Sequence, residues 1–277
     1  MRASYTAAAV AELIKQQIYV DWVAGISAGC TNLANYISRD RVRSRKSFTD
    51  LALDPNLGNL KTWISGEGLF NADYIYQQTS DPGQLLEYDW ETHDNNPAEF
   101  RVGAFRADDG QQVFWGREDI ETRKDFLTRV QASSTMPVFM PPVEIDGETY
   151  VDGALGPSGG IPIDEARAAG FKKFLVILTR PRDYVKSPFR ADAITKRVFK
   201  DFPAVTEGLL ARPANYNQTR EELFDLEASG YAYVYAPTGF TVSSHERRIA
   251  RLKRSYIEGT QQIRSEIPAI KDFLGLD

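Results

Sequence analysis

The sequence predicts an α/β protein in which a mainly parallel sheet is covered by helices on both faces. Segments with the pattern of strands alternate with segments of helical periodicity along its 277 residues, and this alternation is typical of such folds. The run 173–179 is dense in Leu, Val and Ile, as buried parallel strands are. Hydrophobic residues make up 42% of the chain, which is enough to bury a full core. No repeat or change of composition marks a second domain, so we expect a single domain over residues 1–277.

The elements expected up to residue 152 begin with a helix, and the first strand follows directly. Residues 4–16 carry a broad apolar face, with Ser4 as a candidate N-cap, and the apolar run 20–26 has strand character. Two Asp-Gly pairs, each between alternating segments, predict hairpins. The further elements expected are a helix from residue 28, an irregular helical insertion over about 40–90, strands 99–105 and 112–115, a helix over 119–133, and strands 143–145 and 149–151.

The elements expected after residue 152 continue the alternation of strands and helices. They are a helix over 163–169 that ends at Gly170, the buried strand 173–179, helices over 192–201, 213–229 and 244–269, and a strand over 232–235 between the last two helices.

Composition excludes several classes of function. A net charge of -5 provides no basic surface for nucleic acid. The most apolar run, 174–178, is too short to span a bilayer, and the start of the chain shows no signal peptide. The single cysteine, Cys30, rules out an intrachain disulfide and a cysteine-rich zinc site, and two histidines are too few for a histidine-rich metal centre. We therefore expect a cytosolic protein that needs neither a metal nor another cofactor.

The pattern Gly-x-Ser-x-Gly at residues 25–29 stands where the first strand is followed by a helix. A serine on such a tight turn is typical of the nucleophile elbow, and glycines on either side let strand and helix approach each other. The amides at the start of the following helix favour negative charge at the same point. The context indicates Ser27 as the nucleophile, framed by Gly25 and Gly29, with the amide of Ala28 as an oxyanion donor. A turn with an ordinary N-cap serine is the alternative.

A serine hydroxyl needs a base to take its proton, and the chain offers two kinds of candidate. Ser27, Asp152 and His245 occur in the chain order of an α/β-hydrolase triad. That fold places several strands before its elbow, however, and here a single strand precedes Ser27. His245 and His93 have polar neighbours, which favour solvent-facing positions. Asp152 follows a strand directly, where an α/β sheet presents side chains to a ligand crevice.

The chain around Asp152 resembles a known family. The run 132–142, a hairpin, Asp152-Gly153-Ala154 and an Ile-Pro pair at 161–162 are similar to the C-terminal signature of patatin-like phospholipases. The Gly-x-Ser-x-Gly pattern near the N-terminus completes the pair of motifs. The resemblance covers most of the chain and is strongest to the bacterial subgroup of patatin-like esterases.

This resemblance implies both a fold and a chemistry. The fold is a three-layer α/β/α sandwich with a mainly parallel central sheet and the elbow near the N-terminus. The chemistry is hydrolysis of acyl esters of lipids by a serine and an aspartate, with no histidine. By motif, Ser27 is the nucleophile, Asp152 is the general base, and Gly153 and Ala154 support the motif.

The start of the chain departs from the family pattern. Patatin-like proteins begin with an apolar strand and a glycine-rich loop that contains an arginine, and the amides of this loop form the oxyanion hole. Arg2 matches that arginine and the helix from Ser4 matches the one after the loop, but the glycines and the strand are absent. We expect the natural protein to continue upstream of Met1, with glycines directly before it. In the residues present, the amide of Ala28 is the remaining donor.

Three functions are compatible with these motifs. A serine acyl-hydrolase acting on lipid or other acyl esters through an acyl-enzyme at Ser27 uses both motifs. A catalytically impaired lipid- or acyl-binding protein is favoured if the glycine-rich loop is truly missing. An acyltransferase of the malonyl-transfer type shares the elbow but needs a catalytic histidine, and neither His93 nor His245 is well placed for that role.

A basic stretch over 38–46 interrupts an otherwise acidic chain. Its functional interpretation is contact with an anionic membrane surface beside the active site, and its alternative is a solvated helix face. The cations concerned are Arg41, Arg43, Arg45 and Lys46. The expected partners are therefore a lipid or acyl-ester substrate and an anionic membrane surface, and not nucleic acid.

Overall fold

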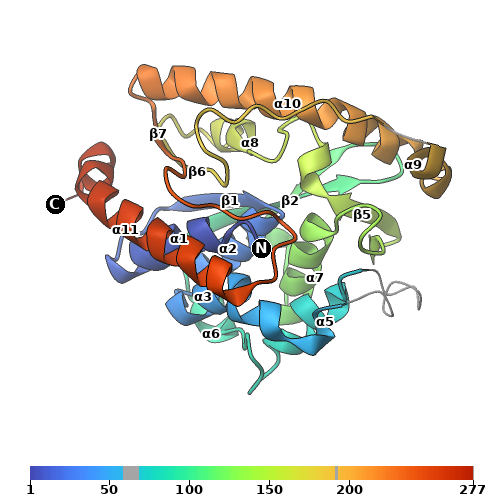
Figure 1. Ribbon diagram of the computed structural model, residues 1–277, viewed down its shortest axis with the longest axis horizontal. Coiled ribbons are helices and arrows are strands. Elements are labelled where there is room, and N and C mark those ends of the chain that lie inside the picture. The colour runs from blue at the N-terminus through green and yellow to red at the C-terminus, as the bar shows by residue number, and fades with distance from the viewer. Residues whose placement is uncertain (59–68, 191–192, 277) are drawn as a thin grey trace.

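The computed structural model describes residues 1–58, 69–190 and 193–276, and its elements confirm the α/β class. Its helices are α1 (Ser4–Lys15), α2 (Ala28–Ile37), α3 (Arg41–Phe48), α5 (Ala72–Tyr76), α6 (Trp90–Asp94), α7 (Arg123–Ser134), α8 (Ile163–Ala168), α9 (Ala193–Val198), α10 (Pro203–Ala228) and α11 (Ile249–Leu274). Its strands are β1 (Trp22–Ile26), β2 (Glu99–Arg106), β3 (Gln112–Trp115), β4 (Val143–Ile145), β5 (Glu148–Asp152), β6 (Phe174–Ile177) and β7 (Ala232–Tyr235). Helices lie on either side of β1 and β2, with α2 and α7 on one side and α8 and α10 on the other (Figure 1).

The expectation of a mainly parallel sheet is wrong for the larger sheet. Its described strands follow the order β1-β2-β5-β4, with β3 also on β2, and the β1/β2 pair alone among them is parallel. The two Asp-Gly turns are one physical reason, because a tight hairpin joins strands that must run antiparallel. Asp146 and Gly147 of the second turn adopt positive φ angles of 54° and 84°, as such a turn requires. The sheet is therefore mixed, and β6 and β7 form a separate parallel pair.

Strands β1 and β5 share one edge of β2 and meet there with their carboxyl ends, while β3 occupies the opposite edge. β1 runs parallel to β2 and ends with Ile26 opposite Gly103. β5 runs antiparallel to β2 and ends with Asp152 opposite Ala104. Because the two strands arrive from opposite directions, the residues at their ends come together beside the same peptide of β2. Ser27 follows Ile26 directly, so the topology alone brings Ser27 next to Asp152.

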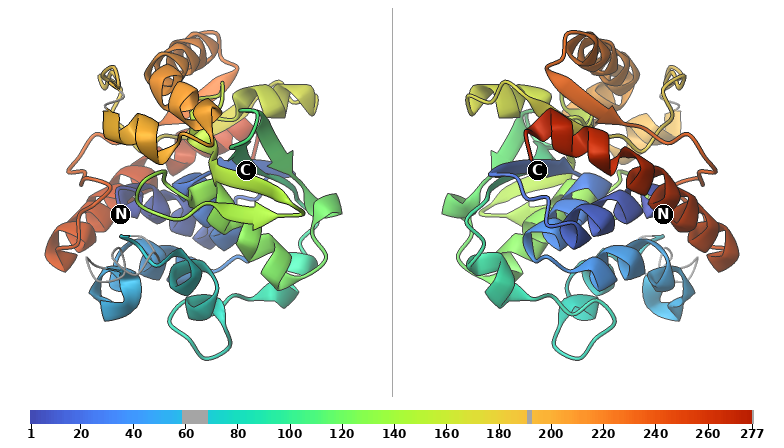
Figure 2. Two further views of the ribbon diagram at one scale, coloured as in Figure 1. Left: turned by 90° about the vertical axis from the view of Figure 1, so that its right-hand side faces the viewer. Right: turned by 90° about the vertical axis from the view of Figure 1, so that its left-hand side faces the viewer.

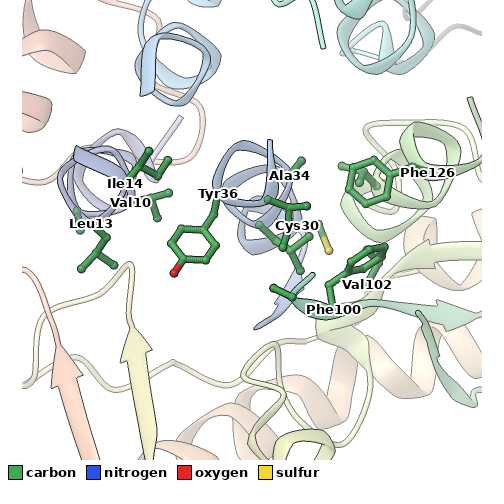
Figure 3. Packing of buried hydrophobic residues seen from close by; sticks show 14 of the residues in the cluster. Val10, Leu13, Ile14, Cys30, Ala34, Tyr36, Phe100, Val102 and Phe126 are labelled. Carbon is green, nitrogen blue, oxygen red and sulfur yellow. The ribbon is translucent and has the colours of Figure 1, made fainter. Parts of the chain in front are cut away.

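The main core lies between α1, α2, α7 and β2 (Figure 3). Helix α1 is buried along nearly its whole length because α11 packs against it, with Arg264 paired with Glu12 at 3.1 Å. Ser4 is the first residue inside this helix and not its N-cap, a position that Ala3 occupies without a side-chain hydrogen bond. The labelled side chains that fill the space around α2 in Figure 3 are Val10, Leu13, Ile14, Cys30, Ala34, Tyr36, Phe100, Val102 and Phe126. Packing from several elements therefore fixes the position of α2, at whose start Ser27 lies.

The two long C-terminal helices begin at other residues than expected. α10 begins at Pro203 and continues through Pro213, where the sequence predicts its start. A proline suits the first turn, since the N–H it lacks has no partner there, whereas Pro213 removes one hydrogen bond and the helix continues past it. α11 begins at Ile249, five residues after the predicted start at 244, so His245 lies in the coil before this helix.

The described parts of the segment over about 40–90, residues 40–58 and 69–90, consist of short helices and turns and lie at the opposite end of the molecule from α10 (Figure 2). Residues 59–68, which belong to the expected insertion, lie outside the described residues, as does residue 192 at the expected start of α9. In the described part of the chain, no helix combines the length and the apolar composition needed to cross a membrane.

The four cations named above for the basic stretch lie in α3, and one of them is not available to a membrane surface. Arg43 is 6% exposed, and its guanidinium donates to the carbonyl of Leu86 at 2.9 Å and to the side chains of Asn35 and Ser80. Arg43 therefore joins α3 to α2 and to the turns before α6, which corrects the membrane interpretation for this residue. The other three of these four cations are at least partly exposed: Arg41, Arg45 and Lys46.

Candidate active site

Ser27 occupies the turn between β1 and α2 with a backbone conformation that few serines adopt. Its φ is 57° and its ψ is -122°, and a positive φ of this kind costs a residue with a side chain about 1–3 kcal/mol. A strained turn of this form presents a serine hydroxyl at the end of a sheet strand. The side chain is half-buried. The backbone of residues 25–29 thus has the shape of an elbow.

The two glycines of the elbow differ in their surroundings. A Cβ on Gly25 would lie 2.5 Å from the carbonyl carbon of Gly29 and 2.7 Å from the amide nitrogen of Cys30, so a side chain does not fit there. A Cβ on Gly29 would meet nothing within 4 Å. The close approach of β1 and α2 therefore requires Gly25, and the expectation that Gly29 serves the same purpose is wrong.

Asp152 is the last residue of β5, and its carboxylate faces Ser27. The Ser27 hydroxyl donates to Oδ2 of Asp152 at 2.9 Å, and the N–H of Ala154 donates to Oδ1 at 2.9 Å. The N–H of Asp152 donates to the carbonyl of Thr135 at 2.8 Å. Asp152 is 2% exposed. Its carboxylate is thus held toward the serine hydroxyl at a position largely closed to solvent.

The turn after Asp152 is packed against β2. A Cβ on Gly153 would lie 2.8 Å from the carbonyl carbon of Gly103, so the turn approaches the strand more closely than a side chain permits. Gln112 of β3 donates to the carbonyl of Gly153 at 3.0 Å. Gly153 therefore allows the close packing of the turn, while Ala154 supplies the amide that orients Asp152.

Ser133 of α7 connects the elbow to β2, and sequence reasoning did not select it. The N–H of Ser27 donates to Oγ of Ser133 at 2.9 Å, and the Ser133 hydroxyl donates to the carbonyl of Gly103. Cys30 lies on the same side, with its Sγ 2.8 Å from the carbonyl oxygen of Gly25. Burial raises the pKa of the Cys30 thiol to about 12, so this cysteine stays protonated and unreactive. The one sequence signal for Ser133 is its place in the run 132–142.

The first turn of α2 offers the candidate oxyanion donors. The N–H of Ser27 is already bonded to Ser133. Within the described residues, the N–H groups of Ala28 and Gly29 form no backbone hydrogen bond, as is usual in the first turn of a helix. The helix dipole favours negative charge at this end. The N–H of Ala28, the donor expected from the sequence, is therefore available to an oxyanion.

His93 lies in the core and not in the polar loop that its neighbours Thr92 and Asp94 predict. It is 1% exposed, and its ring stacks on Trp90 at 4.5 Å and packs against Phe126 at 4.4 Å between centroids. Burial, followed by the positive charge of Arg117, lowers the pKa of His93 to about 3. The ring is therefore neutral at physiological pH and is part of the core, and it is not the hydrogen-bond partner of Ser27.

His245 is exposed, as expected, in the coil before α11. Its ring packs against Phe139 at 5.4 Å between centroids, and its Nδ1 lies 3.4 Å from the hydroxyl of Ser244. Burial on its packed side lowers its pKa. The hydrogen-bond partner of Ser27 is Asp152 and not His245.

An apolar cluster borders the site on the side of residues 136–140. Its buried members are Leu51, Leu57, Phe70, Ala72, Leu86 and Met140, with Met1, Tyr76, Met136 and Phe139 among those packed against them. Burial, with the negative charge of Asp152 as a smaller cause, raises the pKa of Tyr76 to about 12. Met136 directly follows Thr135, which accepts the hydrogen bond from Asp152. The cluster therefore lies next to Asp152.

Arg2 lies half-buried directly before α1, and its Nε is buried without a hydrogen-bond partner. Burial, and then the positive charge of Arg180, lower its pKa to about 10. Arg2 therefore stays charged at neutral pH in surroundings that contain further cations.

Comparison with known proteins matches two parts of the chain. A family model described as patatin-like phospholipase matches residues 1–167, and a model described as Domain of unknown function (DUF6363) matches residues 202–275. The chain is also similar to the uncharacterized protein YjjU of Escherichia coli (strain K12), with 26% identity over 189 residues. That alignment covers 68% of this chain and 51% of YjjU, so the chain spans about half the length of this curated relative. Since residues 1–167 are more than half of the chain and include Ser27 and Asp152, the protein belongs to the patatin-like phospholipase family.

Proposed function

We propose that this protein is a serine acyl-hydrolase that cleaves lipid or other acyl esters through an acyl-enzyme at Ser27. The observation that carries the proposal is the 2.9 Å hydrogen bond from the Ser27 hydroxyl to Asp152 at the strained turn between β1 and α2. Membership of a family described as phospholipases supports lipid esters as the substrate class. No histidine is required, because the carboxylate already lies within hydrogen-bond reach of the proton that a base must take.

The first half of the reaction forms the acyl-enzyme. Oγ of Ser27 bonds to the carbonyl carbon of the ester, its proton passes to Oδ2 of Asp152, and the carbonyl oxygen becomes an oxyanion. As the carbonyl re-forms, the bond to the alcohol oxygen breaks, and the leaving alcohol takes the proton from Asp152. In the second half, water attacks the acyl-enzyme and gives its proton to Asp152, and Ser27 regains a proton as the carboxylic acid leaves.

Two features of the site assist these steps. Asp152 is 2% exposed and its second oxygen is held by the N–H of Ala154, so the carboxylate keeps one orientation throughout. The N–H groups of Ala28 and Gly29 at the start of α2 are the donors available to the oxyanion. Loss of one such donor costs about 10²–10³ in rate in a well-studied protease, so the rate depends on how many donors the site assembles.

The apolar cluster is suited to the acyl chain of the substrate. It borders Asp152 through Tyr76 and through the segment 135–140. A hydrocarbon chain gains about 25 cal/mol for each Å² of apolar surface that leaves water, and the cluster presents methionine and aromatic side chains to such a chain. The carbonyl carbon of the bound ester would then lie between this cluster and the start of α2.

The test combines labelling by a fluorophosphonate with hydrolysis of p-nitrophenyl butyrate. We expect the probe to label Ser27 alone and Ser27→Ala to abolish both labelling and turnover. Asp152→Asn should lower kcat/KM by about 10²–10⁴, the usual contribution of a general base. The asparagine oxygen can still accept from the N–H of Ala154, so the thermal unfolding temperature should be retained.

His245→Ala is the matched control, since it removes the one exposed base in the coil before α11 without touching the Ser27–Asp152 pair. Most activity should remain in this variant. An inactive His245→Ala would replace the dyad by a triad. A folded wild-type protein that is neither labelled nor active, but retains a fluorescent fatty acid, would make it an acyl-binding protein.

A further inference from the structure

Four cations gather beside the candidate active site, and in the part of the chain that the structure describes none of them forms an ion pair with a carboxylate. We call Arg2, Arg180, Lys186 and Arg212 the cation cluster; they come from the segment before α1, the loop after β6, and α10. Among the ion pairs of the described residues, none involves these four side chains. The Nε atoms of all three arginines are buried without a hydrogen-bond partner. Donors in that state carry a free-energy cost unless a further group accepts from them.

The loop that carries Arg180 and Lys186 is fixed on α10. The side chain of Asn217 accepts from the N–H of Lys186 at 2.9 Å and donates to its carbonyl at 3.0 Å. Arg220 donates to the carbonyls of Pro181 and Arg182 at 3.0 and 2.8 Å. These bonds lie at residues 181, 182 and 186, so the part of the loop that carries Arg180 and Lys186 is held in place by α10.

Two neighbouring arginines form ion pairs with carboxylates of α10, in contrast to the cluster. Arg182 forms an ion pair with Glu227 at 2.6 Å, and Arg167 forms one with Glu222 at 2.5 Å. Carboxylates are therefore present along α10, and the fold directs them to Arg182 and Arg167. Arg180 instead lies over the ring of Tyr184 at 4.2 Å from its centroid.

Ring contacts hold part of the cluster together: the Tyr184 ring under Arg180 packs at 6.2 Å on the Tyr216 ring, and Nζ of Lys186 lies 5.4 Å from the centroid of the Tyr216 ring. Asn215, next to Tyr216 on α10, donates to the carbonyl of Gly156 at 3.3 Å, which places α10 beside the turn that follows Asp152. Burial, and then the positive charges of Arg212, Arg2 and Arg180, lower the pKa of Lys186 to about 8, while the Asp152 carboxylate acts in the opposite direction. The same carboxylate also acts on Tyr76 of the apolar cluster. Asp152 therefore has a cationic neighbourhood as well as an apolar one.

We propose that the cation cluster binds a terminal phosphate monoester carried on the alcohol side of the ester that Ser27 cleaves. The proposal rests on the function proposed for Ser27 and narrows its substrates to acyl esters that end in a phosphate monoester. Guanidinium groups suit it because their forked donors match phosphate oxygens in pairs. A phosphate monoester fits better than a phosphodiester, because it carries about -1.5 to -2 charge at neutral pH against four cations. Three of these cations lie beyond residues 1–167, the part matched by the phospholipase family model.

Binding is tested first without catalysis. Inorganic phosphate is titrated calorimetrically into Ser27→Ala, and the same titration is run on Ser27→Ala combined with Arg180→Gln and Arg212→Gln. We expect the two glutamines to weaken binding about tenfold or more, the effect of losing bidentate charged hydrogen bonds. Lys200→Gln, which removes a charge that is 73% exposed just before α10, is the matched control and should leave the affinity unchanged. Phosphate binding that the glutamines do not weaken would overturn the assignment.

Turnover then identifies what carries the phosphate. Three soluble hexanoyl glycerol esters are compared, which end in a phosphate monoester, a phosphocholine diester or a free hydroxyl. We expect the monoester to have a kcat/KM about tenfold or more above the other two in wild-type protein, and the double glutamine variant to lose this preference through KM. Unchanged thermal unfolding of the variant shows that the fold is intact.

The two proposals fail in different ways. Equal turnover of the three esters, unaffected by the glutamines, overturns the headgroup assignment while the hydrolase stands. If free phosphate still binds through the arginines in that case, its source is the solution and not the substrate. No turnover of any ester, with phosphate binding that depends on the arginines, overturns the hydrolase and leaves the phosphate site.

Discussion

A glycine, an arginine and a histidine each occur twice around the elbow, once packed in the protein interior and once on the side where the proposed substrate would bind, which we call the ligand side. The interior set is Gly25, Arg43 and His93, and the ligand-side set is Gly29, Arg212 and His245. Each interior residue is enclosed by backbone, hydrogen-bond acceptors or aromatic rings, whereas each ligand-side residue has open space, an unpartnered donor or solvent beside it. The comparison shows that the surroundings of each residue, and not its type, determine whether it is structural or available to a ligand. It also predicts opposite responses to the same substitution.

The arginine pair should show the largest difference. Arg43 gives hydrogen bonds to Leu86, Asn35 and Ser80, and replacing it by methionine leaves buried acceptors unpaired at about 1–3 kcal/mol each. We expect Arg43→Met to lose about 3 kcal/mol or more of unfolding free energy. Arg212→Met removes one of four mutually repelling charges and should change stability by about 0.5 kcal/mol or less, or stabilise the protein. Urea unfolding in phosphate-free buffer measures both, and equal losses would make Arg212 a structural residue like Arg43.

The glycine pair should show the next largest difference. Gly25→Ala places a Cβ 2.5 Å from the backbone of Gly29, and overpacking of this kind costs about 1–3 kcal/mol. The elbow must shift to relieve the contact, so turnover of p-nitrophenyl butyrate should fall as well. Gly29→Ala meets open space inside α2 and should be neutral or more stable by about 1 kcal/mol, because alanine favours a helix. A Gly25→Ala variant as stable as wild type would show that β1 and α2 do not need a glycine at their contact.

The candidate pair at the site could be predicted because each member is marked by its neighbours in sequence. Glycines frame Ser27, and a hairpin with an Asp-Gly-Ala turn marks Asp152. Their meeting could not be predicted from the residues alone, because it depends on β1 and β5 ending opposite Gly103 and Ala104 of the same strand. Register between distant strands leaves no local pattern, so here the family resemblance supplied what periodicity cannot.

The errors have physical reasons of the same kind. The alternation of strands and helices predicted a parallel sheet, but the antiparallel hairpins around Gly110 and Gly147 form most of the larger sheet. His93 was expected in a loop because its neighbours are polar, yet Trp90, three residues before it, folds onto its ring. The cation cluster could not be predicted from the sequence, because long stretches of chain separate its members. Each member also has the sequence neighbours of an ordinary surface cation. Only the fold brings Arg2 to α10.

The histidine pair should show the smallest difference, and it appears in the dependence of stability on pH. Burial, followed by the charge of Arg117, lowers the pKa of His93 to about 3 in the folded protein, against about 6.5 in an unfolded chain. Between these values the unfolded chain alone holds the proton, so the contribution of His93 to stability is complete above about pH 6.5 and is lost as the pH falls toward 3. The slope approaches about 1.4 kcal/mol per pH unit.

His93→Phe removes this titration and keeps an aromatic ring beside Trp90 and Phe126, while the Tyr88 hydroxyl retains the carbonyl of Ala34 as acceptor at 3.1 Å. As the pH is lowered from about 6.5 to 5, a range in which most carboxylates stay ionised, the unfolding free energy of the wild type should fall by about 1–2 kcal/mol. The fall should be much smaller in this variant. His245→Gln is the control and should keep nearly the wild-type slope, because His245 is exposed. A wild-type slope in His93→Phe, or its loss in His245→Gln, would reverse the assignment of interior and ligand-side histidines.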